Sequence, residues 1–130
     1  MMTKKPIVLQ TEGLGEKPFH GRVALLVNRH TASAAEMIVA FARENHLATI
    51  VGEKTAGRLL SATSVKVGKG FRLAMPTGAY YTWNGLVLEG TPMGPDELIE
   101  FNWRERRGRV DGQLEHVVKS IRGHHAESIS

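Results

Sequence analysis

Apolar runs and polar stretches alternate near the start of the chain in an order that predicts a strand, a helix and a second strand. Val23 to Val27 is a continuous apolar run bounded by polar residues, which is typical of a strand covered on both faces in a parallel sheet. From Ser33 the apolar residues recur at helical spacing, and Asn45-His46 is the expected end of that helix. Ala48 to Val51 is a second short apolar run. This order predicts two parallel strands joined by a right-handed crossover.

The pattern after Gly52 changes to that of β-structure. Ser64 to Val67 and Phe71 to Met75 flank Gly68-Lys69-Gly70, which predicts a hairpin with a three-residue loop. Pro76-Thr77-Gly78 predicts a further turn, because proline and glycine interrupt regular structure.

A second hairpin is predicted around Asn84-Gly85, the strongest short turn signal in the sequence. A type I′ turn needs positive φ at both central residues, and asparagine and glycine tolerate it best. Ala79 to Trp83 precedes the turn and is aromatic and β-branched, and Leu86 to Leu88 is the expected partner strand.

The ends of the chain are patterned more weakly. Ile7 to Leu9 predicts a short strand, and Ile99 to Trp103 predicts another. Asp111 is the expected cap of a last amphipathic helix, which Gly123 ends. The chain is therefore divided into an N-terminal loop or arm (1–20), a core domain (21–123) and a flexible tail (124–130).

Composition restricts the possible chemistry. The 130 residues have the size of one domain. The sequence holds no cysteine, which excludes disulfides, thiolate zinc sites and cysteine nucleophiles. The histidines lack the spacing of metal ligands except for the adjacent pair His124-His125, so no metal and no cofactor is expected. No stretch approaches the roughly 18 apolar residues of a membrane helix, so we expect no membrane partner.

The charge balance argues against a nucleic-acid partner. The formal net charge is +4, which is mild for a chain of this length. The one dense basic run comprises Arg104, Arg106, Arg107 and Arg109. Runs of charge are usually solvent-facing, so we interpret this segment as a solvated polar loop and expect no nucleic-acid binding.

Ser33 is the residue with the most chemical interest, and two interpretations of it stay open. With Glu36 three residues later it has the sequence of a capping box, in which its hydroxyl would cap the helix. It also follows a buried strand at the start of a helix, a place where backbone N–H groups face a bound group. The flanking Ala32 and Ala34 differ from the Gly-x-Ser-x-Gly elbow of hydrolases but would let a substrate carbonyl approach. The amide of Ala34 would then face a developing oxyanion.

Three blocks in this order resemble the C-terminal processing, or tail-specific, serine peptidase family. They are NRHTASAAE, ATIVGEKTAGR and YYTWNGLVLEGTPMGPD. The family includes tricorn-like core proteases and the repeats of interphotoreceptor retinoid-binding protein, and the resemblance covers about Gly21 to Asp96. It implies a ClpP/crotonase-like α/β fold of repeated ββα units, here truncated. It also implies that Ser33 is the nucleophile and that the Ala34 amide is an oxyanion donor.

The sequence departs from the family pattern at the general base. Members of the Ser–Lys type have a lysine just after the GExTxG block, where this sequence has Arg58. Arginine stays protonated in proteins, so it cannot take the serine proton. Lys54 lies too early in the block, and Glu44 is a weak match to an acid of that subgroup.

The TAGRLL sequence resembles the tricorn-like and retinoid-binding branch instead. In the tricorn-like members a serine works with a histidine and a glutamate, and Glu89 falls on the position of that glutamate. The family's histidine-bearing segment, its glycine-rich oxyanion loop and its cap and PDZ regions have no match in this sequence. The resemblance therefore implies the C-terminal part of a larger peptidase, or a truncated homologue.

The sequence thus predicts a serine-peptidase function that is incomplete in the isolated chain, with Ser33 and Glu89 as catalytic residues. Its expected partner is a peptide or protein substrate, and a homo-oligomer or a missing N-terminal segment is expected to complete it. The alternative is a non-catalytic binding module for a ligand or peptide on the same fold.

Overall fold

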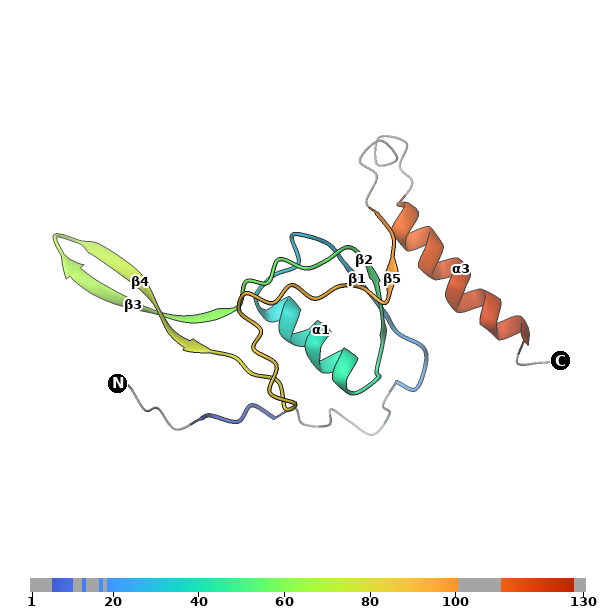
Figure 1. The fold of residues 1–130 in the computed structure, drawn as a ribbon, viewed down its shortest axis with the longest axis horizontal. Coiled ribbons are helices and arrows are strands. Elements are labelled where there is room, and N and C mark those ends of the chain that lie inside the picture. Colours follow the sequence, from blue (N-terminus) through green and yellow to red (C-terminus); the bar gives the residue numbers. More distant parts are fainter. Residues whose placement is uncertain (1–5, 11–12, 14–16, 18, 101–110, 128–130) are drawn as a thin grey trace.

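The computed structural model describes residues 6–10, 13, 17, 19–100 and 111–127. Its elements in chain order are β1 (Ala24–Val27), α1 (Ala34–Glu44), β2 (Thr49–Gly52), β3 (Leu60–Gly68), β4 (Phe71–Ala79), β5 (Glu97–Leu98) and α3 (Gly112–Glu127). Figure 1 shows a small body built from β1, β2, β5 and α1, with the β3–β4 hairpin projecting on one side and α3 lying on the other.

A parallel sheet in the order β1-β2-β5 forms the centre of the body. Leu25 lies opposite Ile50, and the crossover through α1 joins the two strands, so the predicted strand–helix–strand unit is confirmed. Ile50 is fully buried and packs in the core cluster with Val39 and Ala40 of α1. The adjacent Val51 is 2% exposed and points to the opposite face, because side chains alternate along a strand. Helix α3 packs against β1 and β2.

The first predicted hairpin is present but is longer than expected. Strands β3 and β4 pair antiparallel from Leu60↔Ala79 to Gly68↔Phe71, so a two-residue turn, Lys69-Gly70, replaces the predicted three-residue loop. Both turn residues have positive φ, at 48° and 80°, which matches the twist of paired strands. The predicted turn at Pro76-Thr77-Gly78 is wrong: these residues lie inside β4, where a register shift leaves an extra residue on this strand.

The predicted turn at Asn84-Gly85 is present with a different conformation. The amide of Gly85 donates to the carbonyl of Thr82 at 3.0 Å, and Gly85 alone of the two residues has positive φ, at 85°. The type I′ assignment is therefore wrong. The hydroxyl of Thr82 accepts the amide of Leu86 at 3.1 Å and holds the turn from its other side. The flanking segments are joined by a single bridge, Tyr81↔Val87, in place of the predicted strands.

Several predictions at the two ends of the chain are wrong or cannot be compared. Ile7 to Leu9 belongs to no strand. Among the described residues the last strand is β5 at Glu97–Leu98, which begins two residues before the predicted start. Asp96 lies just ahead of it, and its carboxylate accepts the amide of Ile50 of β2 at 2.8 Å. Residues 101–103 and the basic run at 104–109 lie outside the described residues.

The last helix begins as predicted and continues further. Asp111 accepts the amide of Leu114 at 3.0 Å, so its capping role is confirmed. Helix α3 runs on to Glu127, so the predicted end at Gly123 is wrong and the boundary drawn after residue 123 falls inside the helix. In the part of the chain that the structure describes, neither helix has the length and apolarity that crossing a bilayer requires.

Candidate active site

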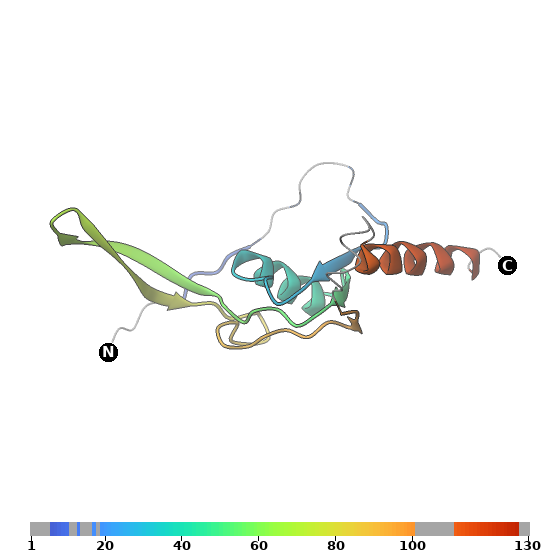
Figure 2. The same ribbon diagram turned by 90° about the horizontal axis from the view of Figure 1, so that it is seen from above.

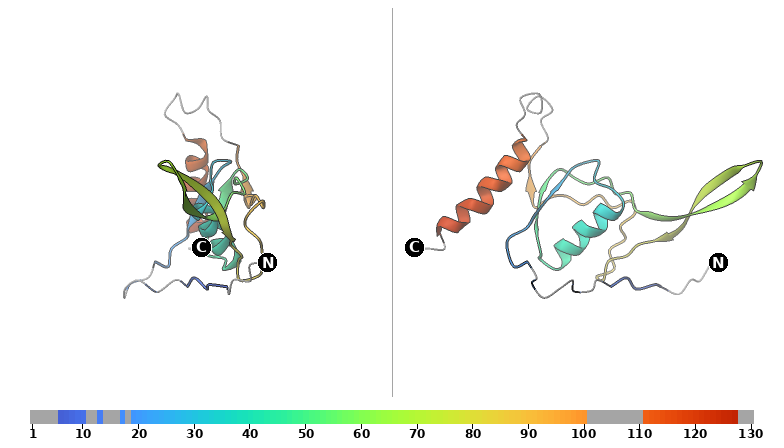
Figure 3. Two further views of the ribbon diagram at one scale, coloured as in Figure 1. Left: turned by 90° about the vertical axis from the view of Figure 1, so that its left-hand side faces the viewer. Right: turned by 180° about the vertical axis from the view of Figure 1, so that it is seen from behind.

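The turn between β1 and α1 is held by short-range hydrogen bonds. Asn28 accepts the amide of His30 on its side chain at 2.8 Å, and its own amide donates to the hydroxyl of Thr31 at 3.0 Å. The turn delivers the chain to Ser33, which has φ 59° and ψ −131°. Positive φ is uncommon for a residue other than glycine and marks a strained position. Figures 1 and 3 show that the first turn of α1 lies beside the base of the β3–β4 hairpin.

The capping box predicted at this turn does not form. Ser33 is the N-cap residue of α1, but its side chain makes no capping hydrogen bond. Its amide donates to the carbonyl of Arg58 at 2.9 Å instead of meeting the carboxylate of Glu36. The Ser33 side chain is exposed, and its hydroxyl makes no hydrogen bond to any described residue. The interpretation of Ser33 as only a helix cap is therefore wrong.

Glu36 turns away from Ser33 and is fully buried. Its carboxylate accepts the hydroxyl of Thr55 at 2.6 Å, the amide of Gly57 at 2.7 Å and the amide of Arg58 at 2.8 Å. Three donors surround this buried carboxylate. Their hydrogen bonds replace those that it would make with water, which offsets the free-energy cost of burying it. The amide of Ala56 also donates to the carbonyl of Thr31, at 2.9 Å. Segment 55–58 is thereby attached to the β1–α1 turn and to the first turn of α1.

Glu89 holds the same segment from the other side. Its carboxylate oxygen Oε2 accepts the amide of Leu59 at 2.7 Å, and the amide of Gly90 donates to the carbonyl of Gly57 at 2.9 Å. The amide of Ser33 donates to the carbonyl of Arg58, and Glu89 accepts the amide of Leu59, so the structure brings the two predicted catalytic residues to the same peptide group, the one that joins Arg58 to Leu59. Glu89 is half-buried, which leaves part of its carboxylate accessible.

The start of α1 offers free amide groups next to Ser33. The first N–H groups of a helix have no intrahelical acceptor. The amide of Glu36 donates to the carbonyl of Ser33 at 2.9 Å. The exposed Ala34 has no hydrogen bond from its amide to any oxygen of the described residues. An N–H group in this position, at the positive end of a helix, can stabilise a negative oxygen.

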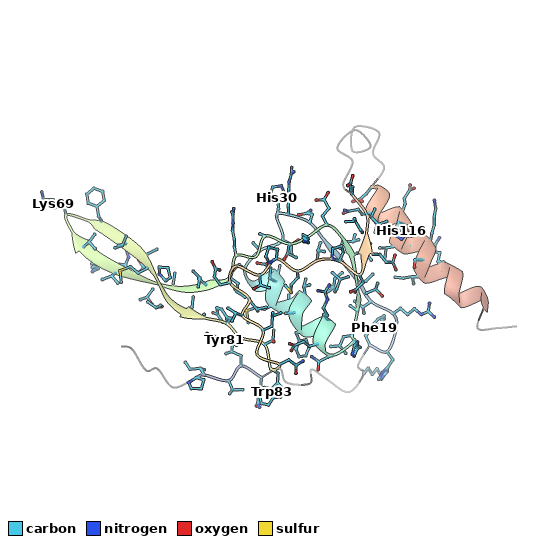
Figure 4. The ribbon with its side chains drawn as sticks, in the orientation of Figure 1. Phe19, His30, Lys69, Tyr81, Trp83 and His116 are labelled. Carbon is cyan, nitrogen blue, oxygen red and sulfur yellow. The ribbon has the colours of Figure 1, made fainter. Side chains whose placement is uncertain are left out.

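The general base predicted from the resemblance is not supplied by the described histidines. His30 is exposed and accepts from Arg29 at 3.3 Å, and in Figure 4 it lies on the turn that precedes α1. His116 binds Glu97 at 2.8 Å on the far side of the sheet. Neither these two nor His20 and His46 make a hydrogen bond with Ser33 or Glu89. Glu44 lies at the opposite end of α1 from Ser33, about 16 Å away for a helix of 11 residues.

The hydrogen bond between Glu36 and Thr55 is the contact at the candidate site that sequence reasoning missed. The pair is separated by 19 residues, and Glu36 was assigned to a local cap. Thr55 also accepts the amide of Met93 at 2.9 Å, which ties the loop before β5 to the same cluster. The available signal was that Glu36 and Thr55 each belong to a block that carries the family resemblance.

The parallel sheet and the strand-to-helix turn define a mixed α/β domain, in which an exposed serine lies at the start of a helix with an accessible amide beside it. Comparison of the sequence with protein families identifies the group more narrowly. The chain belongs to peptidase family S41, whose family model matches residues 2–99.

Individual relatives agree with this family. The chain is 29% identical over 109 residues to the carboxy-terminal-processing protease of Bartonella bacilliformis, covering 84% of this chain and 24% of that protein. It resembles the structure of the photosystem II D1 C-terminal processing protease with a TM-score of 0.56 and 30% identity, over 61% of this chain and 20% of the other. The tricorn protease matches in fold, with a TM-score of 0.70 and 19% identity over 78% of this chain and 10% of the other. The chain thus spans about a quarter or less of the length of these relatives.

Proposed function

We propose that this chain carries the nucleophile of a serine peptidase that hydrolyses peptide bonds by acyl transfer. The observation that carries the proposal is the exposed hydroxyl of Ser33, which is not used for capping although it stands at the N-terminus of α1. A hydroxyl used only to cap the helix would be bonded to the amide of its second or third residue.

The proposed mechanism assigns a role to each group at the turn. Ser33 attacks the substrate carbonyl, and the oxygen that becomes negative meets the amide of Ala34. Glu89 orients a histidine that takes the serine proton and later gives it to the leaving amine. In this proposal the histidine comes from another segment or another chain, because no described histidine contacts Ser33 or Glu89. The substrate is a peptide or protein, and the isolated chain turns it over poorly.

The proposal extends to the finer class of the fold. We assign the domain to the ClpP/crotonase-like group of ββα units. The parallel β1–α1–β2 crossover and the position of Ser33 at the start of its helix support this assignment.

The experiment that tests the function is active-site labelling. The chain is treated with a fluorophosphonate probe, with and without imidazole in place of the base that the described residues do not supply, and the labelled residue is mapped by peptide mass spectrometry. We expect the label on Ser33 and faster labelling in imidazole. A folded chain that is labelled at other serines, or not labelled in either buffer, contradicts the proposal.

Glu89→Gln is expected to slow the labelling of Ser33 in imidazole at least about tenfold. This is less than the loss of rate that follows removal of the orienting carboxylate from a complete triad, because free imidazole is held less firmly. The glutamine oxygen still accepts the amide of Leu59, so the free energy of unfolding should change by less than about 1 kcal/mol. Denaturant unfolding and labelling kinetics of the same preparation separate the two effects. Equal labelling rates in the variant and the wild type would remove Glu89 from the mechanism.

The second candidate function is a non-catalytic binding module. Arg58 favours it, because a guanidinium stands where Ser–Lys peptidases have their base. This alternative predicts no labelling of Ser33 even in imidazole, together with a rise in Tm when a ligand or peptide binds.

A further inference from the structure

The β3–β4 hairpin carries an apolar face that the described residues leave uncovered. Figures 1 and 2 show it as a two-stranded ribbon that projects away from the sheet and α1. In its register Val65 lies opposite Leu73 and Thr63 opposite Met75, so these side chains share one face with Val67. Val65, Val67, Leu73 and Met75 are 42–57% exposed, and Phe71 at the end of the same face is 70% exposed. Two-stranded hairpins are marginally stable alone, so this ribbon is suited to receive another strand.

The two edges of the ribbon differ. Strand β4 contains Pro76, which has no amide to donate, and the register shift beside it adds an unpaired residue. Proline and bulges are features that protect an edge from further pairing. Strand β3, from Leu60 to Gly68, contains no proline, and its own extra residue, Val67, lies at the far end beside the turn. The stretch from Ala62 to Lys66 is regular and pairs only with β4 among the described residues. Its outer edge is therefore the open one.

An apolar segment that matches this edge occurs in the same chain. Ile7, Val8 and Leu9 are 87%, 60% and 68% exposed and belong to no strand or helix. We propose that Pro6–Gln10 of a second copy of the chain adds to the outer edge of β3 as a third strand. Ile7 and Leu9 then extend the apolar face, Val8 faces the other side, and the proline stands at the first position of the strand, where it is tolerated.

Charge favours this exchange over the contact of two hairpin faces. Residues 60–79 carry Lys66, Lys69 and Arg72 and no acid, so two hairpins repel each other, whereas Pro6–Gln10 is uncharged. In a symmetric pair both copies donate a strand, which doubles the backbone hydrogen bonds of the contact.

A second copy is the occupant because the segment and the edge do not meet within one chain. Figure 1 shows the segment, in blue, running apart from the hairpin, and no hydrogen bond joins it to β3. The chain can therefore present its open edge to the same segment of another chain without a change in the body.

The absence of cysteine in the sequence permits a direct test by disulfide cross-linking between copies. Chains with Val8→Cys are mixed with chains that carry Ser64→Cys or, as the matched control, Ala74→Cys on its cross-strand partner. A strand added to β3 lies roughly 5 Å from the first position and roughly 10 Å from the second. We expect the mixed dimer to form at least about tenfold faster with Ser64→Cys than with Ala74→Cys. If the register is shifted by two residues, the same difference is expected between Lys66→Cys and its cross-strand partner Arg72→Cys.

Several results would overturn the proposal. One is an equal yield from β3 and β4 positions, and another is no mixed dimer from any of the four. A chain with both Val8→Cys and Ser64→Cys that forms only an intramolecular disulfide would show docking within one copy.

Sedimentation equilibrium on cysteine-free chains gives an independent readout. Ile7→Asp should weaken dimerisation at least about tenfold, and an unchanged dimer Kd contradicts the added strand. Far-UV circular dichroism confirms that each variant is folded.

Discussion

Ser33→Ala is expected to abolish covalent labelling by a fluorophosphonate at the β1–α1 turn. The reagent forms its bond with the serine oxygen, and alanine has none. In a complete peptidase the same change costs up to about six orders of magnitude in turnover, because the residues of a catalytic triad act as a unit. With imidazole in place of a positioned histidine, the expected fall in peptide hydrolysis is smaller, at least about a hundredfold.

The change should leave the fold intact. The hydroxyl of Ser33 makes no capping bond, so the usual loss of about 1 kcal/mol for a removed cap should not occur. Ser61→Ala is the matched control, since Ser61 lies in β3, close in sequence to the loop at Arg58. Peptide mapping should show the label lost in Ser33→Ala and retained in Ser61→Ala. Labelling that persists in folded Ser33→Ala would exclude this serine as the nucleophile.

Glu36→Ala is expected to destabilise the chain by about 3–5 kcal/mol, because it leaves the hydroxyl of Thr55 and the amides of Gly57 and Arg58 without their acceptor. All these contacts are buried or partly buried, and Glu36 itself has no exposed surface. The midpoint of denaturant unfolding measures the loss. Glu44→Ala in the same helix is the matched control, with an expected change within about 0.5 kcal/mol.

A milder variant links the cluster to the proposed reaction. Glu36→Gln keeps an oxygen for Thr55 and Gly57 but places an amide nitrogen opposite the amide of Arg58, so a loss of about 1–3 kcal/mol is expected. The carbonyl of the same residue, Arg58, accepts the amide of Ser33, so displacement of the Arg58 backbone should also slow the labelling of Ser33. A stability loss with unchanged labelling would mean that the cluster supports only the fold.

Local patterns predicted the elements whose stability depends on their own residues. The apolar run at β1, the helical spacing of α1 and the apolar run at β2 follow from burial against one another, and Asp111 caps α3 from three residues away. The same reasoning failed where a residue far away in the sequence determines where an element begins or ends. Pro76 lies inside a strand because the hairpin accommodates it with a register shift. Strand β5 follows directly after Asp96, whose carboxylate accepts the amide of Ile50 in β2.

The sequence by itself determined the strand–helix–strand core, the position of Ser33 at a helix start and the blocks that mark the family. Glu36 shows what it left open: a serine followed by a glutamate three residues later fits a cap, and nothing nearby indicates otherwise. Only the tertiary structure decided that this carboxylate binds segment 55–58, 19 to 22 residues away, and that the hydroxyl of Ser33 remains free. The physical reason is that a buried carboxylate is most stable where several donors surround it. Those donors come together only when α1 and segment 55–58 pack against each other.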